Sequence, residues 1–343
     1  MAATVTKVVD PDLGSGYDYD SLYDWEAAQQ GDLTGARDEI AVAKCRCTGG
    51  TADTVAQPQI TGWTTSATQY IKIWTDTSES YRPTGVGWPT GNKYRLEVNG
   101  GTATGITISQ NYTIIDGIWT SQPNADVAGF TLYDGSSGGC IISNCVARNT
   151  SANSTTAAFT HGGVNEVAPN KVINCIAYGP WEWGLYLRGN NATSYTLTYN
   201  CTAHGCAIGF RSRSAYCRAK NCLSIGCTDA FLETEAYEIA DYNAYDEGTD
   251  PGTNGVDLSA YTDAQIFVDA ANGDFHLAAS SPAIGVGINL YNDANYAFQV
   301  DIDGNDRGGS GATWDIGAYE YVSAVTNLSI YASECVGSEG IFN

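Results

Sequence analysis

Four segments in the middle of the chain repeat one unit: GFTLYDGSSGGCIISNCVARN (129–149), AFTHGGVNEVAPNKVINC (158–175), GLYLRGNNATSYTLTYNC (184–201) and GFRSRSAYCRAKNC (209–222). Each begins with a small residue before a large apolar one, and each reaches an Asn-Cys pair. A fifth unit opens at Ala230-Phe231, and its Asn243 is followed by Ala244. The openings lie 29, 26, 25 and 21 residues apart. A drifting period in the twenties, with short apolar alternations and no helical pattern, predicts a β-solenoid.

Alternate residues of each unit are expected to face opposite sides of a strand. The predicted inward side chains are Phe130, Leu132, Leu185, Leu187, Phe210 and Phe231. The predicted outward side chains are Thr131, Tyr133, Thr160, Tyr186, Arg188, Arg211 and Arg213. Coils stacked in register at ~4.8 Å turn each repeated position into a column along the solenoid.

Two such columns receive structural roles. Asn tolerates left-handed turns and its amide bonds neighbouring backbone, which favours a turn position for Asn144, Asn174, Asn200 and Asn221. The next residues, Cys145, Cys175, Cys201 and Cys222, are expected to be small apolar fillers of the interior. The total of eleven Cys is odd, and CxxC metal spacing is absent. Stacked thiols are therefore favoured over disulfides or metal ligands.

The predicted organisation has three parts. Residues 1–50 form an N-terminal cap, with strands at Val5–Val9 and Glu39–Cys45 and a helix opened by Ser21 and ending near Gln30. Residues 51–321 form the solenoid, with regular coils at about 106–247, irregular coils at 248–321 and an earlier strand at Tyr94–Val98. Residues 322–343 form a closing strand or a detachable arm.

Charge and hydropathy restrict the function classes. The net charge of −22 disfavours binding to nucleic acid. Residues 135–228 nevertheless hold seven Lys or Arg against two Glu, so the repeat region is basic within an acidic protein. The sequence shows neither a signal peptide nor a run of ~20 apolar residues. We therefore expect synthesis in a cytosol, no membrane insertion, and a location on a virion or an extracellular surface.

The Gly-Phe and Asn-Cys coils resemble the right-handed parallel β-helix repeat proteins of the pectate-lyase-like superfamily, as found in bacteria and bacteriophages. The C-terminal text DFHLAASSPAIGVG…DIDGNDRGG…WDIGAYEY is similar to the closing segment of such proteins, and GYDYDSLYDWEAAQQGDL is similar to their capping helix. The resemblance implies an all-β, right-handed parallel β-helix with a short N-terminal helix and an irregular C-terminal closure. It leaves function open, because the superfamily contains lyases, hydrolases, adhesins and virion proteins.

The resemblance also implies what an enzyme of this kind would need. A lyase would carry several Asp on one outward sheet face to bind Ca²⁺, whereas that face here offers Tyr and Arg. A hydrolase would need two carboxylates ~5–9 Å apart. Glu182 with Glu233 or Glu235 is the candidate pair. Asp301, Asp303, Asn305 and Asp306 are candidate calcium ligands, against the alternative of a plain turn. The three His share no column, so a His-based site is not expected.

The remaining candidate is an outward surface of aromatic and arginine residues: Trp181, Trp183, Tyr186, Arg188, Arg211 and Arg213. Aromatic rings stack on sugars and guanidinium groups match carboxylates, so this surface predicts binding of an acidic glycan or an acidic protein. The favoured function is a non-enzymatic virion structural or adhesion protein of a bacteriophage: a spike, a fibre or a capsid decoration. Its expected partners are a second copy of the chain (as a trimer or filament), other virion proteins or a cell-surface glycan. No cofactor is expected, and Ca²⁺ is the one candidate ion. The alternatives are a polysaccharide lyase or hydrolase and a self-assembling extracellular filament subunit.

Overall fold

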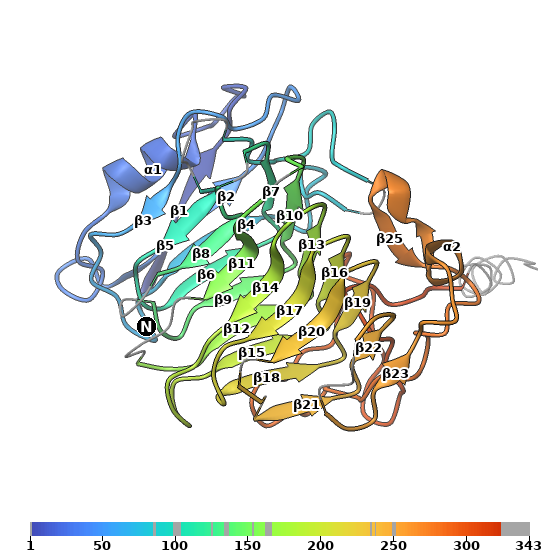
Figure 1. Cartoon of the computed structure of the whole chain (residues 1–343). Helices are drawn as coiled ribbons and strands as arrows, with labels where there is room; N and C mark the ends of the chain where they lie inside the picture. Colours follow the sequence, from blue (N-terminus) through green and yellow to red (C-terminus); the bar gives the residue numbers. More distant parts are fainter. Residues whose placement is uncertain are drawn as a thin grey trace, which may run out of the picture.

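A computed structural model describes residues 2–84, 87–98, 104–124, 126–133, 137–152, 154–161, 167–233, 235–236, 238–248 and 252–323. Within these residues, most strands belong to three long parallel sheets (Figure 1). Sheet 1 contains β1 (Ala3–Val9), β2 (Glu39–Cys45), β4 (Ile71–Thr75), β6 (Thr113–Asp116), β9 (Ile141–Ser143), β12 (Asn170–Ile173), β15 (Thr196–Tyr199), β18 (Cys217–Lys220) and β21 (Ile239–Asp241).

The strands of the other two sheets also pair in parallel from one coil to the next. Sheet 2 contains β7 (Trp119–Gln122), β10 (Val146–Asn149), β13 (Ile176–Tyr178), β16 (Thr202–His204), β19 (Leu223–Ile225), β22 (Ala244–Tyr245) and β23 (Val256–Asp257). Sheet 3 contains β3 (Gln59–Ile60), β5 (Ile106–Ile108), β8 (Phe130–Leu132), β11 (Ala157–His161), β14 (Trp183–Leu187), β17 (Ile208–Ser212) and β20 (Asp229–Glu233).

Each regular coil visits the three sheets once, in the order sheet 1, sheet 2, sheet 3. The strands β12, β13 and β14 make one coil, and each pairs in parallel with the next coil through β15, β16 and β17. The protein is a parallel β-helix. The predicted fold class is confirmed, and the regular coils run from β5 to β22.

The small-large pair that opens each repeat has a steric cause. Phe130, Phe159, Leu185, Phe210 and Phe231 follow one another in register on the inner face of sheet 3, and all are buried. The preceding residue lies where sheets 2 and 3 approach. A Cβ on Gly184 would lie 3.0 Å from Cβ of Ala203, and a Cβ on Gly209 would lie 3.0 Å from Cβ of Ser224. A small residue is therefore required before each large side chain, and at Gly184 and Gly209 even a Cβ would be crowded.

The Asn column lies at the turn between sheets 1 and 2. Asn144, Asn174, Asn200 and Asn221 have φ values of 54°, 51°, 51° and 54°, which is the left-handed conformation that Asn tolerates better than most residues. Nδ2 of Asn174 donates to Oδ1 of Asn144, and Nδ2 of Asn221 donates to Oδ1 of Asn200, each at a distance of 3.2 Å. Side-chain amides thus bridge neighbouring coils at this corner.

The fifth unit departs from the predicted alignment by one residue. Lys220 pairs with Asp241 and Leu223 with Ala244, so Tyr242 stands at the left-handed position (φ 52°) and Asn243 stands opposite Cys222. The amide of Asn243 accepts from the backbone N–H of Cys222 at 2.9 Å. Asn243 therefore lies outside the Asn turn column, because the strand pairing places Tyr242 at the turn position of this unit.

The cysteines that follow the Asn residues are fully buried. Each thiol donates to a carbonyl two residues earlier and to another in the preceding coil, as Cys222 does to Lys220 and Thr198. All ten cysteines in the described part of the chain are free thiols. Burial raises the pKa of Cys222 to about 12, so this thiol stays protonated near neutral pH.

The N-terminal end of the coil is covered by helix α1 (Leu22–Gln29). Ser21 caps it by accepting from the backbone N–H of Asp24 at 3.0 Å, and Leu22 and Trp25 are buried. Trp25 stacks on Trp63 with ring centroids 5.6 Å apart. The helix therefore closes the apolar interior at this end, as a solenoid requires. The predicted strand at Tyr94–Val98 is wrong: Leu96 makes only single bridges to Asp53 and Thr120.

The C-terminal part differs from the expected irregular coils. After β23 come α2 (Asp263–Ile266), β24 (Phe267–Asp269), the 3₁₀ turn η1 (Ala270–Asn272) and β25 (Asp274–Leu277), with β24 and β25 antiparallel. These elements lie beside the coils instead of extending them (Figure 1). Gly317 donates from its backbone N–H to the carbonyl of Asn221, and Ala318 donates to Oγ1 of Thr202. The segment after β23 thus runs back over the outside of the coils.

The predicted arm at 322–343 lies outside the described residues apart from Val322 and Ser323.

Candidate anion-binding surface

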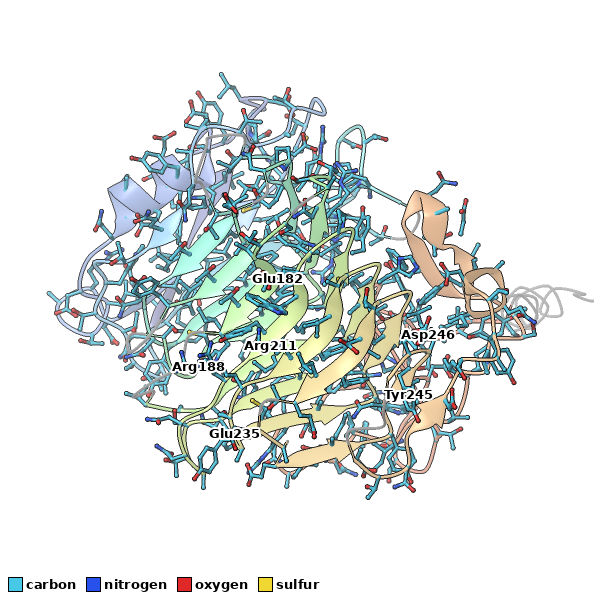
Figure 2. All side chains as sticks on the ribbon, in the orientation of Figure 1. Glu182, Arg188, Arg211, Glu235, Tyr245 and Asp246 are labelled. Atoms are coloured by element: carbon cyan, nitrogen blue, oxygen red, sulfur yellow. The ribbon has the colours of Figure 1, made fainter. Side chains whose placement is uncertain are left out.

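The outer face of sheet 3 brings together four of the predicted binding residues. Tyr186 on β14 pairs directly with Arg211 on β17, and Trp183 lies at the start of β14. Arg213 follows β17, and its backbone N–H donates to Leu187 at 3.0 Å. Figure 2 shows Arg211 over these strands, with Glu182 and Arg188 at opposite ends of β14. We call Trp183, Tyr186, Arg211 and Arg213 the arginine surface.

The aromatic rings hold the guanidinium groups in place. Cζ of Arg211 lies 4.9 Å from the ring centroid of Trp183 and 5.6 Å from that of Tyr186. Nη1 of Arg213 donates to Oη of Tyr186 at 2.8 Å. The two rings pack with centroids 5.1 Å apart. Cation–π contacts of this kind fix a planar cation at a modest energy, so the rings position the arginines. Trp183 is half-buried, whereas Tyr186 is only 8% exposed and acts mainly as a support.

The arginine surface keeps its positive charge. In the described ranges, neither Arg211 nor Arg213 has a carboxylate within ion-pair distance. Nε of Arg211 and Nε1 of Trp183 are both buried without a hydrogen-bond partner there. Other cations of the repeat are neutralised by the acidic flanks: Arg218 binds Glu238 at 2.8 Å and Lys220 binds Asp293 at 2.7 Å. Arg211 and Arg213 thus place two cations without an ion pair on neighbouring positions of sheet 3, within the described residues.

Two other predicted members behave differently. Trp181 is only 1% exposed, and Nε1 donates to the carbonyl of Ala147 at 3.4 Å. Its predicted place on the binding surface is wrong, because the ring fills the interior before β14 begins. Arg188 is half-buried at the end of β14, where its carbonyl accepts from Thr196.

The candidate catalytic carboxylates do not form a pair. Trp183 pairs with Ile208, which pairs with Asp229. Glu182 therefore lies level with residue 228, two coils away, whereas Glu233 is about five residues (roughly 16 Å) farther along the strand direction. Glu235 lies beyond the end of β20. Since hydrolysis requires carboxylates ~5–9 Å apart, the predicted pairing of Glu182 with Glu233 or Glu235 is wrong.

Glu182 instead lines a shallow pocket of about 420 Å³ at the start of the strands of sheet 3. The pocket also includes Pro180, Ala207 and Thr228 from successive coils. Glu182 directly precedes Trp183 in the chain, so the pocket lies next to the arginine surface.

The candidate calcium ligands are occupied by hydrogen bonds. The carboxylate of Asp301 accepts from the backbone N–H groups of Asp303, Asn305 and Glu320 and from Nδ2 of Asn305. Asp306 accepts from Gly308 and Gln299. Among the described residues, no group of three or more His, Cys, Asp or Glu is placed to hold a metal ion. These four side chains build a turn whose carboxylates are engaged by protein donors.

That turn contacts a histidine that sequence reasoning treated as isolated. Nδ1 of His276 lies 2.6 Å from Asp274 and Nε2 lies 2.9 Å from Asp303, while the ring stacks on Tyr319 at 4.0 Å. Burial lowers the pKa of His276, but Asp303 and Asp274 outweigh it and raise the pKa to about 9. The spacing of Asp274 and His276 in the sequence could have predicted their contact, whereas the contact with Asp303 arises only from the fold.

This histidine predicts a pH dependence of stability. A folded-state pKa raised from 6.5 to about 9 stabilises the fold fully below pH 6.5, and this stability is lost as pH rises through 9. Between pH 7 and 9 the loss should be roughly 2 kcal/mol. Glu320, whose pKa burial raises to about 7, acts in the same direction at lower pH.

Urea unfolding under reducing conditions at pH 7 and pH 9 measures this loss. His276→Gln should be less stable than the wild type at pH 7 and should show a smaller loss between the two pH values. Equal losses in both proteins would exclude His276 as the titrating group.

Comparisons with known proteins identify no family for this chain. No protein-family model matches the chain, and no curated protein matches it. The solved structure of pectate lyase Pel9A is similar over 94% of this chain and 97% of that chain, with 15% sequence identity and a TM-score of 0.36. The three parallel sheets themselves confirm the resemblance to the parallel β-helix repeat proteins as a likeness of fold. None of the described helices is long and apolar enough to cross a membrane.

Proposed function

We propose that the protein is a non-enzymatic binding protein of the adhesion class, which uses the arginine surface of sheet 3 to hold a carboxylated glycan. Its proposed setting is the surface of a bacteriophage virion, as a spike, fibre or capsid decoration, or another extracellular surface. The observation that carries the binding role is the pair Arg211 and Arg213, held by aromatic rings and unpaired with carboxylates in the described chain.

The chemistry of this pair suits a carboxylate ligand. A guanidinium presents forked N–H donors that match a carboxylate, and Arg is less strongly hydrated than Lys. In a protein of net charge −22, an anion can approach only where the local potential is positive. Half-buried Trp183 adds apolar area beside the charges, which suits a ligand that combines carboxylates with sugar rings. Tyr186 is only 8% exposed and contributes by holding Arg213.

The separation of Glu182 from Glu233 and Glu235 supports binding over acid–base hydrolysis. A lyase remains the alternative function, and product analysis distinguishes it. Release of unsaturated or reducing ends from a polysaccharide would replace the binding proposal by an enzymatic one.

Replacing both Arg211 and Arg213 by Ala should weaken binding to polygalacturonate, used as a probe of repeated carboxylates. Hydrogen bonds to charged groups contribute about 1.5–3 kcal/mol each, so a loss of at least about 2 kcal/mol, or roughly thirtyfold in Kd, is expected. Isothermal titration at 50 and 300 mM salt measures it, and wild-type binding should weaken at the higher salt.

Arg37→Ala with Arg95→Ala is the matched control. These two arginines bind Glu39 and Glu97 in the N-terminal part of the chain, so the double variant removes equal charge far along the chain from the arginine surface. Equal weakening of polygalacturonate binding in both double variants would show that net charge alone causes the loss. That result would contradict a defined binding site on sheet 3.

The biological setting has its own test. Genes for capsid or tail proteins beside this gene would support the virion proposal, and genes for polysaccharide breakdown would contradict it. Sedimentation of the purified protein separates both from a filament subunit, which would form long assemblies.

A further inference from the structure

The outer face of sheet 1 is apolar along most of its length. One row of outward residues runs across the strands in register: Val42, Lys72, Ile114, Ile141, Lys171, Leu197 and Arg218. A sheet face that points to water normally carries polar side chains. Aliphatic residues in this row therefore indicate that another polypeptide segment covers the face.

One half of this face is covered by the chain itself. Leu290 and Trp314 from the C-terminal segment form a buried cluster with Ile173, Leu197 and Tyr199 of β12 and β15. The ring of Tyr296 lies 5.6 Å from Nζ of Lys171. The covering segment thus reaches β12.

No described part of the C-terminal segment packs on the other half, where Val42 is buried and the remaining apolar side chains are half-buried. We define the apolar strip as six outward side chains on β2, β4, β6 and β9 and on the residue before β4: Ile40, Val42, Tyr70, Trp74, Ile114 and Ile141. Two shallow depressions of about 220 Å³ each lie on it: one is lined by Val42, Lys72 and Trp74, the other by Tyr112, Ile114 and Ile141. The strip continues the surface that the C-terminal segment covers from β12 onward.

We propose that residues 324–343 of the same molecule dock on the apolar strip and complete the cover of sheet 1. Their sequence, AVTNLSIYASECVGSEGIFN, supplies apolar side chains at Val325, Leu328, Ile330 and Phe342. The occupied half of the face shows which side chains suit it, since Ile288, Leu290 and Phe298 pack there.

The described chain ends within reach of the strip. Val322 lines one pocket with His276, which binds Asp303. Asp303 and Glu79 line a second pocket, and Glu79 binds Lys44, the register partner of Trp74. Twenty extended residues span up to about 65 Å. A covalently linked segment also has a high effective concentration, which favours its own molecule over a neighbour.

Charge supports the same occupant. Residues 324–343 contain Glu334 and Glu339 and neither Lys nor Arg. Lys72, which pairs in register with Val42 and Ile114 of the strip, lies 3.8 Å from the ring centroid of Trp74 and makes no ion pair within the described ranges. An acidic, apolar segment is thus complementary to the strip.

Hydrogen–deuterium exchange on the full chain tests the proposal. In the wild type, amides of residues 324–343 should exchange at least tenfold more slowly than in Ile114→Asp, and Val55→Asp, which charges an exposed apolar residue elsewhere, should behave as the wild type. Leu328→Asp tests the other side of the contact without altering the folded body, and it should also abolish the protection.

Two results would overturn the proposal. Exchange of residues 324–343 at free-peptide rates in the wild type excludes docking. Protection that grows with protein concentration, together with dimers or filaments in sedimentation, assigns the strip to a second copy instead. Neither result bears on the arginine surface, which lies on another sheet.

Discussion

Replacing Arg307 by Met should lower the free energy of unfolding by about 3–5 kcal/mol, the usual effect of breaking a buried ion pair. The side chain of Arg307 is fully buried, and Nη1 binds Glu320 at 3.1 Å. Nη2 donates to the carbonyls of Gly317 and Ala318 and to Oδ1 of Asn174. One guanidinium therefore joins the C-terminal segment to the Asn column, and its loss leaves several acceptors unsatisfied.

Urea unfolding of Arg307→Met measures this effect, with Arg37→Met as the control. Arg37 binds Glu39 but its side chain is 31% exposed, so that change should cost below about 1 kcal/mol. A separate early transition in Arg307→Met would mean that the C-terminal segment detaches before the coils unfold. Equal stability of the two variants would contradict the role of Arg307 as the link.

Replacing Phe210 by Ala should also cost about 3–5 kcal/mol, through lost burial and a cavity. Phe210 is fully buried and stacks on Phe231 with ring centroids 4.9 Å apart and planes 12° from parallel. On its other side it pairs in register with Leu185. Because each inner side chain contacts the same position of the neighbouring coils, a cavity here affects three coils at once.

Leu232→Ala is the matched control, since Leu232 points outward from the same sheet and is half-buried. It should cost about 1 kcal/mol or less. Thermal unfolding of both variants compares them directly. A cost for Leu232→Ala equal to that for Phe210→Ala would contradict the assignment of inner and outer faces.

The repeat predicted the fold because its constraints are local. A left-handed turn selects Asn174 or Asn200, and the narrow edge between sheets selects Gly184 or Gly209. These demands recur in each coil, so the spacing predicted a β-solenoid, and the alternation within each unit predicted the inner stack of Phe side chains and the outward position of Tyr186 and Arg211.

The remainder depended on contacts between distant segments. The insertion of Arg307 beside Asn174 joins residues 133 positions apart, which no local pattern encodes. The return of residues 288–314 over sheet 1 was likewise invisible, as was the burial of Trp181, one residue before the outward pattern starts. The candidate site was predicted in part: Arg211, Arg213, Trp183 and Tyr186 lie together, whereas the Glu pair failed once register fixed its separation.

Retention of the wild-type protein on immobilised polysaccharides tests the central claim most directly. The account predicts retention on polygalacturonate at 50 mM salt and elution at higher salt. It also predicts no retention on uncharged dextran and no release of sugar ends from the column. Passage through polygalacturonate without retention, or binding to dextran of equal strength, would contradict the assignment of the arginine surface to a carboxylated glycan.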